Sequence, residues 1–355
     1  MIAIFYKAFN KIVHEIDAER LAEIDYEDLL WIDLANPTDD EREAVEIFFN
    51  INLQTRQQVE EIESSSRYFE TENLIIANSN FLINRDNIYI TEPVSFTLKD
   101  GILISVRTLD LKAFSDTIRK VYSNHKAYPT GYHTLIALLE TRIDLDADMV
   151  EALAKEIATL TKRLRIAEEL DEELILEISK LQENTMLIRE NFMDKQRVVS
   201  GILKSERFPN DTYPKLNIMT RDIGSLINHT DFSFERLEYL QNTFLGLINI
   251  EQNKIIKIFT VVSVVFMPPT LIASVYGMNF TLFPEIKWTY GYPFALALML
   301  LSSLTTLFIF KRRKWLWEAG SKKPEVESKE LINRIKKYTM NISSLNWLKF
   351  IVVIG

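Results

Sequence analysis

Two long runs without a charged side chain constrain this chain more than any other feature. Residues 258–275 are 18 consecutive uncharged residues, and residues 288–310 are 23. A helix needs about 20 mostly apolar residues to cross the roughly 30 Å of hydrocarbon in a bilayer, so both runs are long enough. The sequence therefore predicts a membrane protein with transmembrane helices at residues 255–277 and 288–310.

Charged residues beside the two runs predict their orientation. Lys254 and Lys257 precede the first run and residues 311–314 (Lys-Arg-Arg-Lys) follow the second, whereas the loop between them carries only Glu285 and Lys287. Cytoplasmic flanks of transmembrane helices are enriched in Lys and Arg. We therefore expect a multi-pass protein of the cell inner (plasma) membrane with both termini cytoplasmic. The first residues lack a signal-peptide pattern, which agrees with a cytoplasmic N-terminal part.

Charge is unevenly distributed along the chain. Residues 1–250 contain 27 basic and 44 acidic residues, whereas the rest contains 14 basic and 6 acidic ones. An acidic domain repels nucleic acid and attracts cations, so we expect no nucleic-acid partner, although the same charge is also typical of a domain that is simply soluble. The absence of cysteine excludes disulfides and thiolate metal sites.

The N-terminal third has the pattern of a mixed α/β domain, which we predict at residues 1–131. Apolar runs rich in β-forming residues occur at 1–9, 29–34, 74–83 and 88–98. Lys99-Asp100-Gly101 then predicts a hairpin into residues 102–106. Thr38 followed by Glu41 predicts a capped helix start.

Residues 132–254 predict long helices that form a stalk below the membrane. They are rich in Leu, Glu, Lys and Ala at helical spacing, with breaks only at 167–171 and 207–214. The last helix begins after Pro214 and has no strong breaker before Pro268. It is therefore predicted to continue into the first membrane run, although a coiled coil has the same pattern.

The first membrane run has one polar face. Alternate steps of three and four from Asn253 select Ile256, Thr260, Ser263, Met267, Thr270, Ser274 and Gly277, which we call the polar stripe. Every Ser and Thr of the run belongs to it, and the remaining positions are Ile, Val, Phe, Pro, Leu or Ala. Backward steps reach Asn249, Gly246 and Asn242.

Two interpretations of the polar stripe remain open. Small and hydroxylated residues on one face favour a dry contact between helices. A stripe that continues from the cytoplasm to the outer end instead favours the lining of a watery path. Two helices cannot enclose such a path, so this interpretation requires several copies of the chain around an axis. Pro268 and Pro269 predict a bend in the lining helix.

The stripe ends at Tyr276-Gly277-Met278-Asn279, which opens the predicted external loop at 278–287. In this two-span context the motif resembles the CorA family of magnesium transport proteins, where Gly-Met-Asn follows the first of two C-terminal spans. The chain is similar to that family over about residues 1–317. The similarity includes Trp31-Ile-Asp-Leu34 and the stretches 37–42, 60–63 and 246–258.

This resemblance implies an α+β membrane protein: a homopentameric channel in the lipid bilayer, with a cytosolic α/β domain on a helical stalk. It implies passive, potential-driven Mg²⁺ transport, with Co²⁺ or Ni²⁺ also passing, gated by cytosolic divalent cation. By position, it implies gating residues at Asn253, Ile256, Phe259 and Met267, although Phe259 lies one place off the stripe. Mg²⁺ would also be regulatory; candidate acidic ligands are Asp222, Glu235 and Glu238, which could equally be a solvated helix face.

Chemistry at the motif agrees with a magnesium mouth. Mg²⁺ dehydrates reluctantly, so neutral oxygens such as Asn279 side chains and Gly277 carbonyls suit its hydrated form. The alternative is that Gly277 and Asn279 only cap the helix. Many relatives carry an acid after Gly-Met-Asn-Phe, whereas Thr281-Leu282 stands here and leaves Glu285 as the loop's one carboxylate.

Other functions are also considered. A zinc transporter of the same architecture, or a membrane-anchored sensor or scaffold without ion flux, would share these spans. The four His residues are scattered and no metalloprotease or P-loop motif occurs, so we expect neither an enzyme nor an organic cofactor. Residues 311–355 form a basic cytosolic end and tail, and we assign the tail, 318–355, no function.

Overall fold

The computed structural model describes residues 1–9, 11–60, 67–85, 88–166, 172–278 and 288–313. These fall into two units, Met1–Phe244 and Leu245–Gly355, each of which is described by itself. Asn279, Glu285, Lys287 and the tail from residue 314 lie outside the described residues. The predictions made for them are therefore not addressed by the structure.

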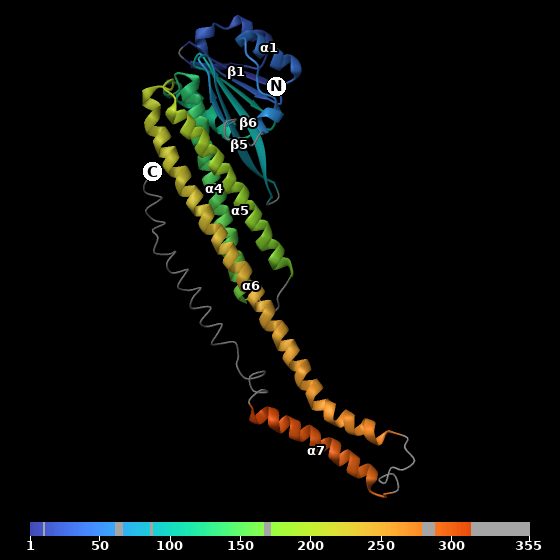
Figure 1. Cartoon of the computed structure of the whole chain (residues 1–355). Helices are drawn as coiled ribbons and strands as arrows, with labels where there is room; N and C mark the ends of the chain where they lie inside the picture. Colours follow the sequence, from blue (N-terminus) through green and yellow to red (C-terminus); the bar gives the residue numbers. More distant parts are fainter. Residues whose placement is uncertain (10, 61–66, 86–87, 167–171, 279–287, 314–355) are drawn as a thin grey trace. The chain divides into compact units, whose positions relative to one another are not determined.

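The first unit is built on a seven-stranded sheet (Figure 1). Its strands are β1 Ile2–Ala8, β2 Lys11–Glu15, β3 Leu29–Ala35, β4 Tyr68–Glu70, β5 Ile75–Arg85, β6 Ile88–Lys99 and β7 Ile102–Arg107. The order is β2-β1-β3-β7-β6-β5-β4, and only the β3–β7 pair is parallel. The predicted hairpin joins β6 to β7 with Asp100 and Gly101 at positive φ, as a tight turn requires.

One face of the sheet packs on α1 (Asp39–Phe49). Because side chains alternate along a strand, Ile2, Ile4 and Ile32 share this face with Val45 and Phe49 of the helix. The predicted capping box at Thr38 is confirmed: its side chain accepts from the Glu41 N–H, and the Glu41 carboxylate accepts from the Thr38 N–H.

The opposite face holds an aromatic core and a buried ion pair. The Phe5 and Trp31 rings stack at 4.8 Å, and Phe114 of α3 (Lys112–Ser123) lies 5.9 Å from Trp31. Arg107 pairs with Asp33 at 2.8 Å, and its guanidinium lies 4.5 Å above the Phe114 ring. Burial raises the pKa of Asp33, and Arg107 opposes that shift.

Long helices make up the rest of the first unit. They are α4 Gly131–Ile166, α5 Glu172–Lys204 and the first part of α6 Tyr213–Tyr276, which run side by side in Figure 1. The predicted break at 207–214 is confirmed, while residues 167–171 are outside the description. The buried residues of α6 recur at steps of three, four or seven: Leu216, Met219, Ile223, Thr230, Ser233, Leu237, Leu240 and Phe244. This spacing produces one packed face of α6, as in a helical bundle.

Some elements differ from the sequence prediction. β2, β4, α3 and the short helix α2 (Arg56–Glu60) did not appear in it. The last long helix begins at Tyr213 and continues through Pro268 and Pro269 without a break. The second apolar helix, α7, is Gly291–Arg312 and so begins three residues later than predicted. Pro293 occupies its first turn, where a missing N–H costs nothing.

Candidate functional site

Among the described residues, two helices are apolar and long enough to cross a membrane, as the sequence predicted. The best 18-residue windows of α6 and α7 have a mean hydropathy of 2.0 each. Only 6% and 11% of the residues in these windows are buried inside the chain. In a soluble protein such apolar helices would be core, so the surface left open here requires lipid or other chains as its covering.

The polar stripe lies on the open side of α6. Ile256 is 61% exposed and Met267 66%, and the Ser and Thr members of the stripe are exposed as well. Phe259, one place off the stripe, is 67% exposed. The partly buried residues of the same segment follow another spacing: Val261, Val264, Val265, Pro268, Pro269, Ile272 and Tyr276. The stripe is therefore not the face that this chain covers by itself.

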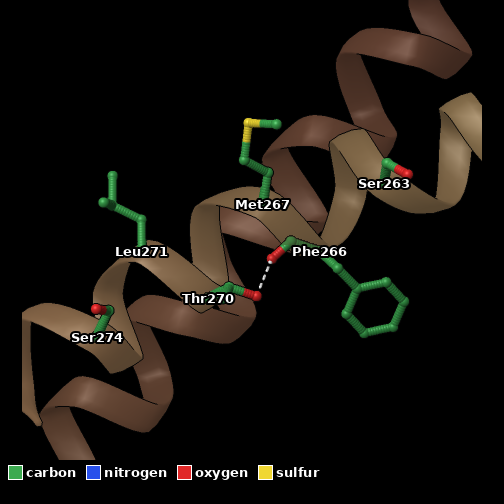
Figure 2. A pocket seen from close by; sticks show the side chains of 6 residues that line it. All are labelled: Ser263, Phe266, Met267, Thr270, Leu271 and Ser274. Carbon is green, nitrogen blue, oxygen red and sulfur yellow. Dashed lines mark hydrogen bonds between the residues drawn. The ribbon is translucent and has the colours of Figure 1, made fainter.

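A shallow hollow of about 480 Å³ lies on the stripe (Figure 2). Ser263, Met267, Thr270 and Ser274 line it together with Phe266 and Leu271. The last two stand one position to either side of the stripe and were not selected by the sequence pattern. Steps of four from Met267, instead of alternating threes and fours, would have included Leu271.

The threonines of the stripe present their oxygens as acceptors. Thr260 donates its hydroxyl proton to the Ile256 carbonyl at 2.7 Å, and Thr270 donates to the Phe266 carbonyl at 2.8 Å. A hydroxyl that has used its proton still has lone pairs to offer. The first water shell of a cation points O–H groups outward, so a row of such acceptors suits a hydrated cation.

The backbone at the end of α6 tests the alternative that Gly277 only caps the helix. The Gly277 N–H donates to the Ala273 carbonyl at 2.9 Å, so the residue continues the helix pattern. Among the described residues, the one glycine with positive φ is Gly101. Gly277 thus does not adopt the left-handed cap for which glycine is usually needed. A side chain there would begin 3.1 Å from the Ala273 carbonyl, a close but adjustable contact.

The candidate regulatory acids lie on the soluble part of α6. Glu235 and Glu238 are exposed and Asp222 is partly buried. Within the described residues, no three Asp, Glu or His side chains gather in one chain as a metal site would need. Burial raises the pKa of Asp144 on α4, and Asp222 is one of the nearby carboxylates that add to the shift.

Comparisons with known proteins agree on one family. A family model described as CorA-like Mg²⁺ transporter protein matches residues 26–312. The magnesium transport protein CorA of Wolinella succinogenes is 36% identical over 322 residues, covering 89% of this chain and 100% of that protein. The protein of the same name from Salmonella typhimurium is 36% identical over 311 residues, covering 85% of this chain and 98% of that protein.

A solved structure shares the fold. The complete structure of the CorA magnesium transporter from Methanocaldococcus jannaschii superposes with a TM-score of 0.74. The match covers 89% of this chain and 98% of that chain at 21% sequence identity. It therefore supports the α+β architecture with two C-terminal apolar helices.

Proposed function

We propose that this chain, which belongs to the CorA-like Mg²⁺ transporter family, carries Mg²⁺ across a membrane along the polar stripe of α6. The observation that carries the proposal is the exposure of this stripe on α6, whose other positions between residues 258 and 275 are apolar. The chain acts as a transporter and not as an enzyme.

The path forms between identical chains. One chain offers one open stripe, so several copies must surround an axis before the stripe encloses water. The proposed state is a homopentamer in a lipid bilayer. Both termini lie on the cytoplasmic side of the inner (plasma) membrane, because Lys254, Lys257 and residues 311–313 flank the spans there.

Mg²⁺ travels hydrated along this path. Asn279 side chains and Gly277 carbonyls bind its water shell at the mouth, and the hydroxyls of Thr270 and Ser274 accept from it further in. No acidic residue lies within residues 258–275, so the path has no negative charge of its own to attract the cation. The driving force for entry is instead an inside-negative membrane potential. That potential supplies about 2.3 kcal/mol per charge per 100 mV, and twice as much for a divalent ion.

Flux in liposomes tests the proposal. The full-length chain is reconstituted and Mg²⁺, Co²⁺, Ni²⁺ and Zn²⁺ entry is followed with indicator dyes under an imposed potential. We expect Mg²⁺ entry that Asn279→Ala reduces about tenfold, a loss of about 1.4 kcal/mol at the mouth. The matched control Asn217→Ala changes an exposed asparagine of α6 outside the stripe and should leave the flux unchanged.

Three outcomes would contradict the proposal. Absence of flux in the parent would favour a sensor or scaffold, and faster Zn²⁺ than Mg²⁺ entry would favour a zinc transporter. Equal flux in Asn279→Ala and the parent would show that the Asn279 side chain does not take part in transport.

Gating is proposed at the apolar members of the path. Ile256, Phe259 and Met267 narrow it and block ions by excluding water, with Asn253 at its inner end. We expect Met267→Ser and Phe259→Ser to leak Mg²⁺ at high internal Mg²⁺, where the parent is closed. Phe259 lies one place off the stripe and is included because the family resemblance implies a gate there. Val262→Ser is the control, because Val262 is 48% exposed, lies off the stripe and is not a gating position by that resemblance. Variants that conduct no more than the parent would exclude both positions as the gate.

Cytosolic Mg²⁺ keeps the assembly closed in this proposal. Asp222, Glu235 and Glu238 bind it with acids of a neighbouring copy, since the described residues of one chain assemble no site alone. Limited proteolysis measures this: Mg²⁺ should protect the parent more than Asp222→Asn. Equal protection would exclude Asp222 as a ligand.

A further inference from the structure

The backbone carbonyl of Asn80 lies at an edge of the sheet. Among the described residues, β4 pairs with β5 only opposite Ile75–Ala77, and the Asn78 N–H donates to the Arg67 carbonyl at 2.9 Å. Alternate residues of a strand direct their backbone groups to the same side. The Asn80 carbonyl therefore points to the same edge of β5 that pairs with β4, but at a position beyond the residues that β4 pairs with.

Two side chains of α5 supply the missing donors. Asn191 Nδ2 donates to the Asn80 carbonyl at 2.7 Å and Lys195 Nζ donates to it at 3.1 Å. Lys195 also donates to the Asn191 carboxamide oxygen. A buried carbonyl without a donor is costly, so these contacts fasten α5 to the sheet.

Lys195 is one of two cations that share one buried carboxylate. Its ammonium lies 2.9 Å from Asp146 Oδ2, and Arg142 donates to the other Asp146 oxygen. Asp146 and Lys195 are 0% and 1% exposed, and Arg142 is 4% exposed. Arg142 already balances Asp146, so the proton on Lys195 is a surplus positive charge in the core.

The remaining neighbours offset that surplus only in part. From β5, the Phe81 ring lies 5.9 Å from Lys195 Nζ and 5.3 Å from the Arg142 guanidinium. From α5, the nearby Asp194 carboxylate is paired with Arg67 at 2.8 Å and Arg197 at 3.0 Å. Burial lowers the pKa of Lys195 to about 8; Asp146 opposes the shift and Arg142 adds to it.

We propose that Lys195 makes the docking of α5 on the sheet proton-sensitive: its surplus charge loosens the junction of α4, α5 and β5, and loss of the proton tightens it. The neutral amine retains N–H groups for the Asn80 carbonyl, while Arg142 still pairs with Asp146. This inference does not depend on the proposed transport.

Proton linkage gives the direction of the effect. The pKa of Lys195 is lowered from 10.5 in the unfolded chain to about 8 in the folded one. Between these values the unfolded chain binds more protons, so stability rises with pH across this window. Below pH 8 both states are protonated and the destabilising charge is fully present.

Thermal unfolding of the full-length chain in detergent tests the proposal. Tm is measured at pH 7 and pH 9.5 for the parent, Lys195→Met and the matched control Lys180→Met, which changes an exposed lysine of the same helix. Between pH 7 and pH 9.5, we expect the Tm of the parent to rise by about 3 °C or more relative to the Tm of Lys195→Met. Lys180→Met should follow the parent, and Lys195→Met should be at least as stable as the parent at pH 7.

A different pattern would overturn the proposal. If Lys195→Met lowers Tm equally at both pH values, Lys195 is an ordinary structural ion pair. Hydrogen exchange of the unmodified parent provides a second test that needs no variant. After correction for intrinsic rates, amides of β5 and of α5 around Lys195 should exchange more slowly at pH 9.5 than at pH 7. Unchanged or faster exchange would also reject the proton-sensitive junction.

Discussion

Phenylalanines in the two units have opposite environments. Phe81 and Phe192 in the first unit are 0% exposed, whereas Phe259 and Phe266 in the apolar part of α6 are 67% and 63% exposed. The residue type is the same, so the difference lies in what covers it. The first unit buries its apolar side chains with its own chain, while the apolar helices of the second unit leave theirs open within the single chain.

Polar groups repeat the contrast. Asp33 in the first unit is satisfied within the chain, by Arg107 and by the Ser105 hydroxyl at 2.8 Å. Among the described residues, the hydroxyls of Thr260 and Thr270 in α6 bond to carbonyls of their own helix, and both residues are exposed. Substitutions should therefore affect folding in the first unit, and assembly or flux in the second.

The largest expected effect is on the buried ion pair. Arg107→Met leaves the Asp33 carboxylate buried without its cation, which should cost about 3–5 kcal/mol of unfolding free energy. Denaturant unfolding in detergent measures it. Protonation of Asp33 removes the stranded charge, so the loss should shrink as pH falls. Arg119→Met is the control, because Arg119 is 80% exposed and should cost under about 1 kcal/mol. A comparable loss of unfolding free energy in both variants would contradict the idea that contacts within the chain stabilise the first unit.

A leucine pair compares the two parts of α6 directly. Leu237→Ala removes a 0% exposed side chain and should cost about 2–5 kcal/mol, because it leaves a cavity. Leu271→Ala changes a 66% exposed side chain in the membrane run and should stay below about 1 kcal/mol in detergent. Thermal unfolding of both variants is the measurement. A large loss for Leu271→Ala would mean that this side chain packs against another copy of the chain instead of facing the proposed watery path.

The smallest expected effect is at the start of α1. Thr38→Ala removes the side chain that accepts from the Glu41 N–H and should cost about 1 kcal/mol. Thr38→Ser keeps the hydroxyl and should recover most of it. Denaturant unfolding measures both, with Mg²⁺ flux unchanged in either variant. Reduced flux at full stability would show that α1 affects transport, against the separation of roles between the units.

Local signals predicted much of this fold. Thr38 and Glu41 are three residues apart, so their capping box is visible in the sequence. The two apolar runs are continuous and predicted the end of α6 and both ends of α7 to within a few residues. β2 was missed because it is short and its residues are mostly exposed, so no apolar run marked it.

Contacts between distant residues could not be predicted in this way. Arg107 meets Asp33 across 74 positions, because β7 pairs in parallel with β3, and no local pattern specifies that register. Lys195 meets Asn80 across 115 positions. The polar stripe was readable as a helix face, but its role and that of Asn279 stay predictions, since both involve other copies or undescribed residues.

The single parallel pair in the sheet sets an order of events during synthesis. β1, β2 and β3 emerge first, yet β3 remains an open edge until β7 is made, some 70 residues later. At about 5–20 residues per second the ribosome exposes that edge for several seconds. The apolar run of α6 appears only about 150 residues after β7. The sheet thus has time to close before the first apolar run is synthesised.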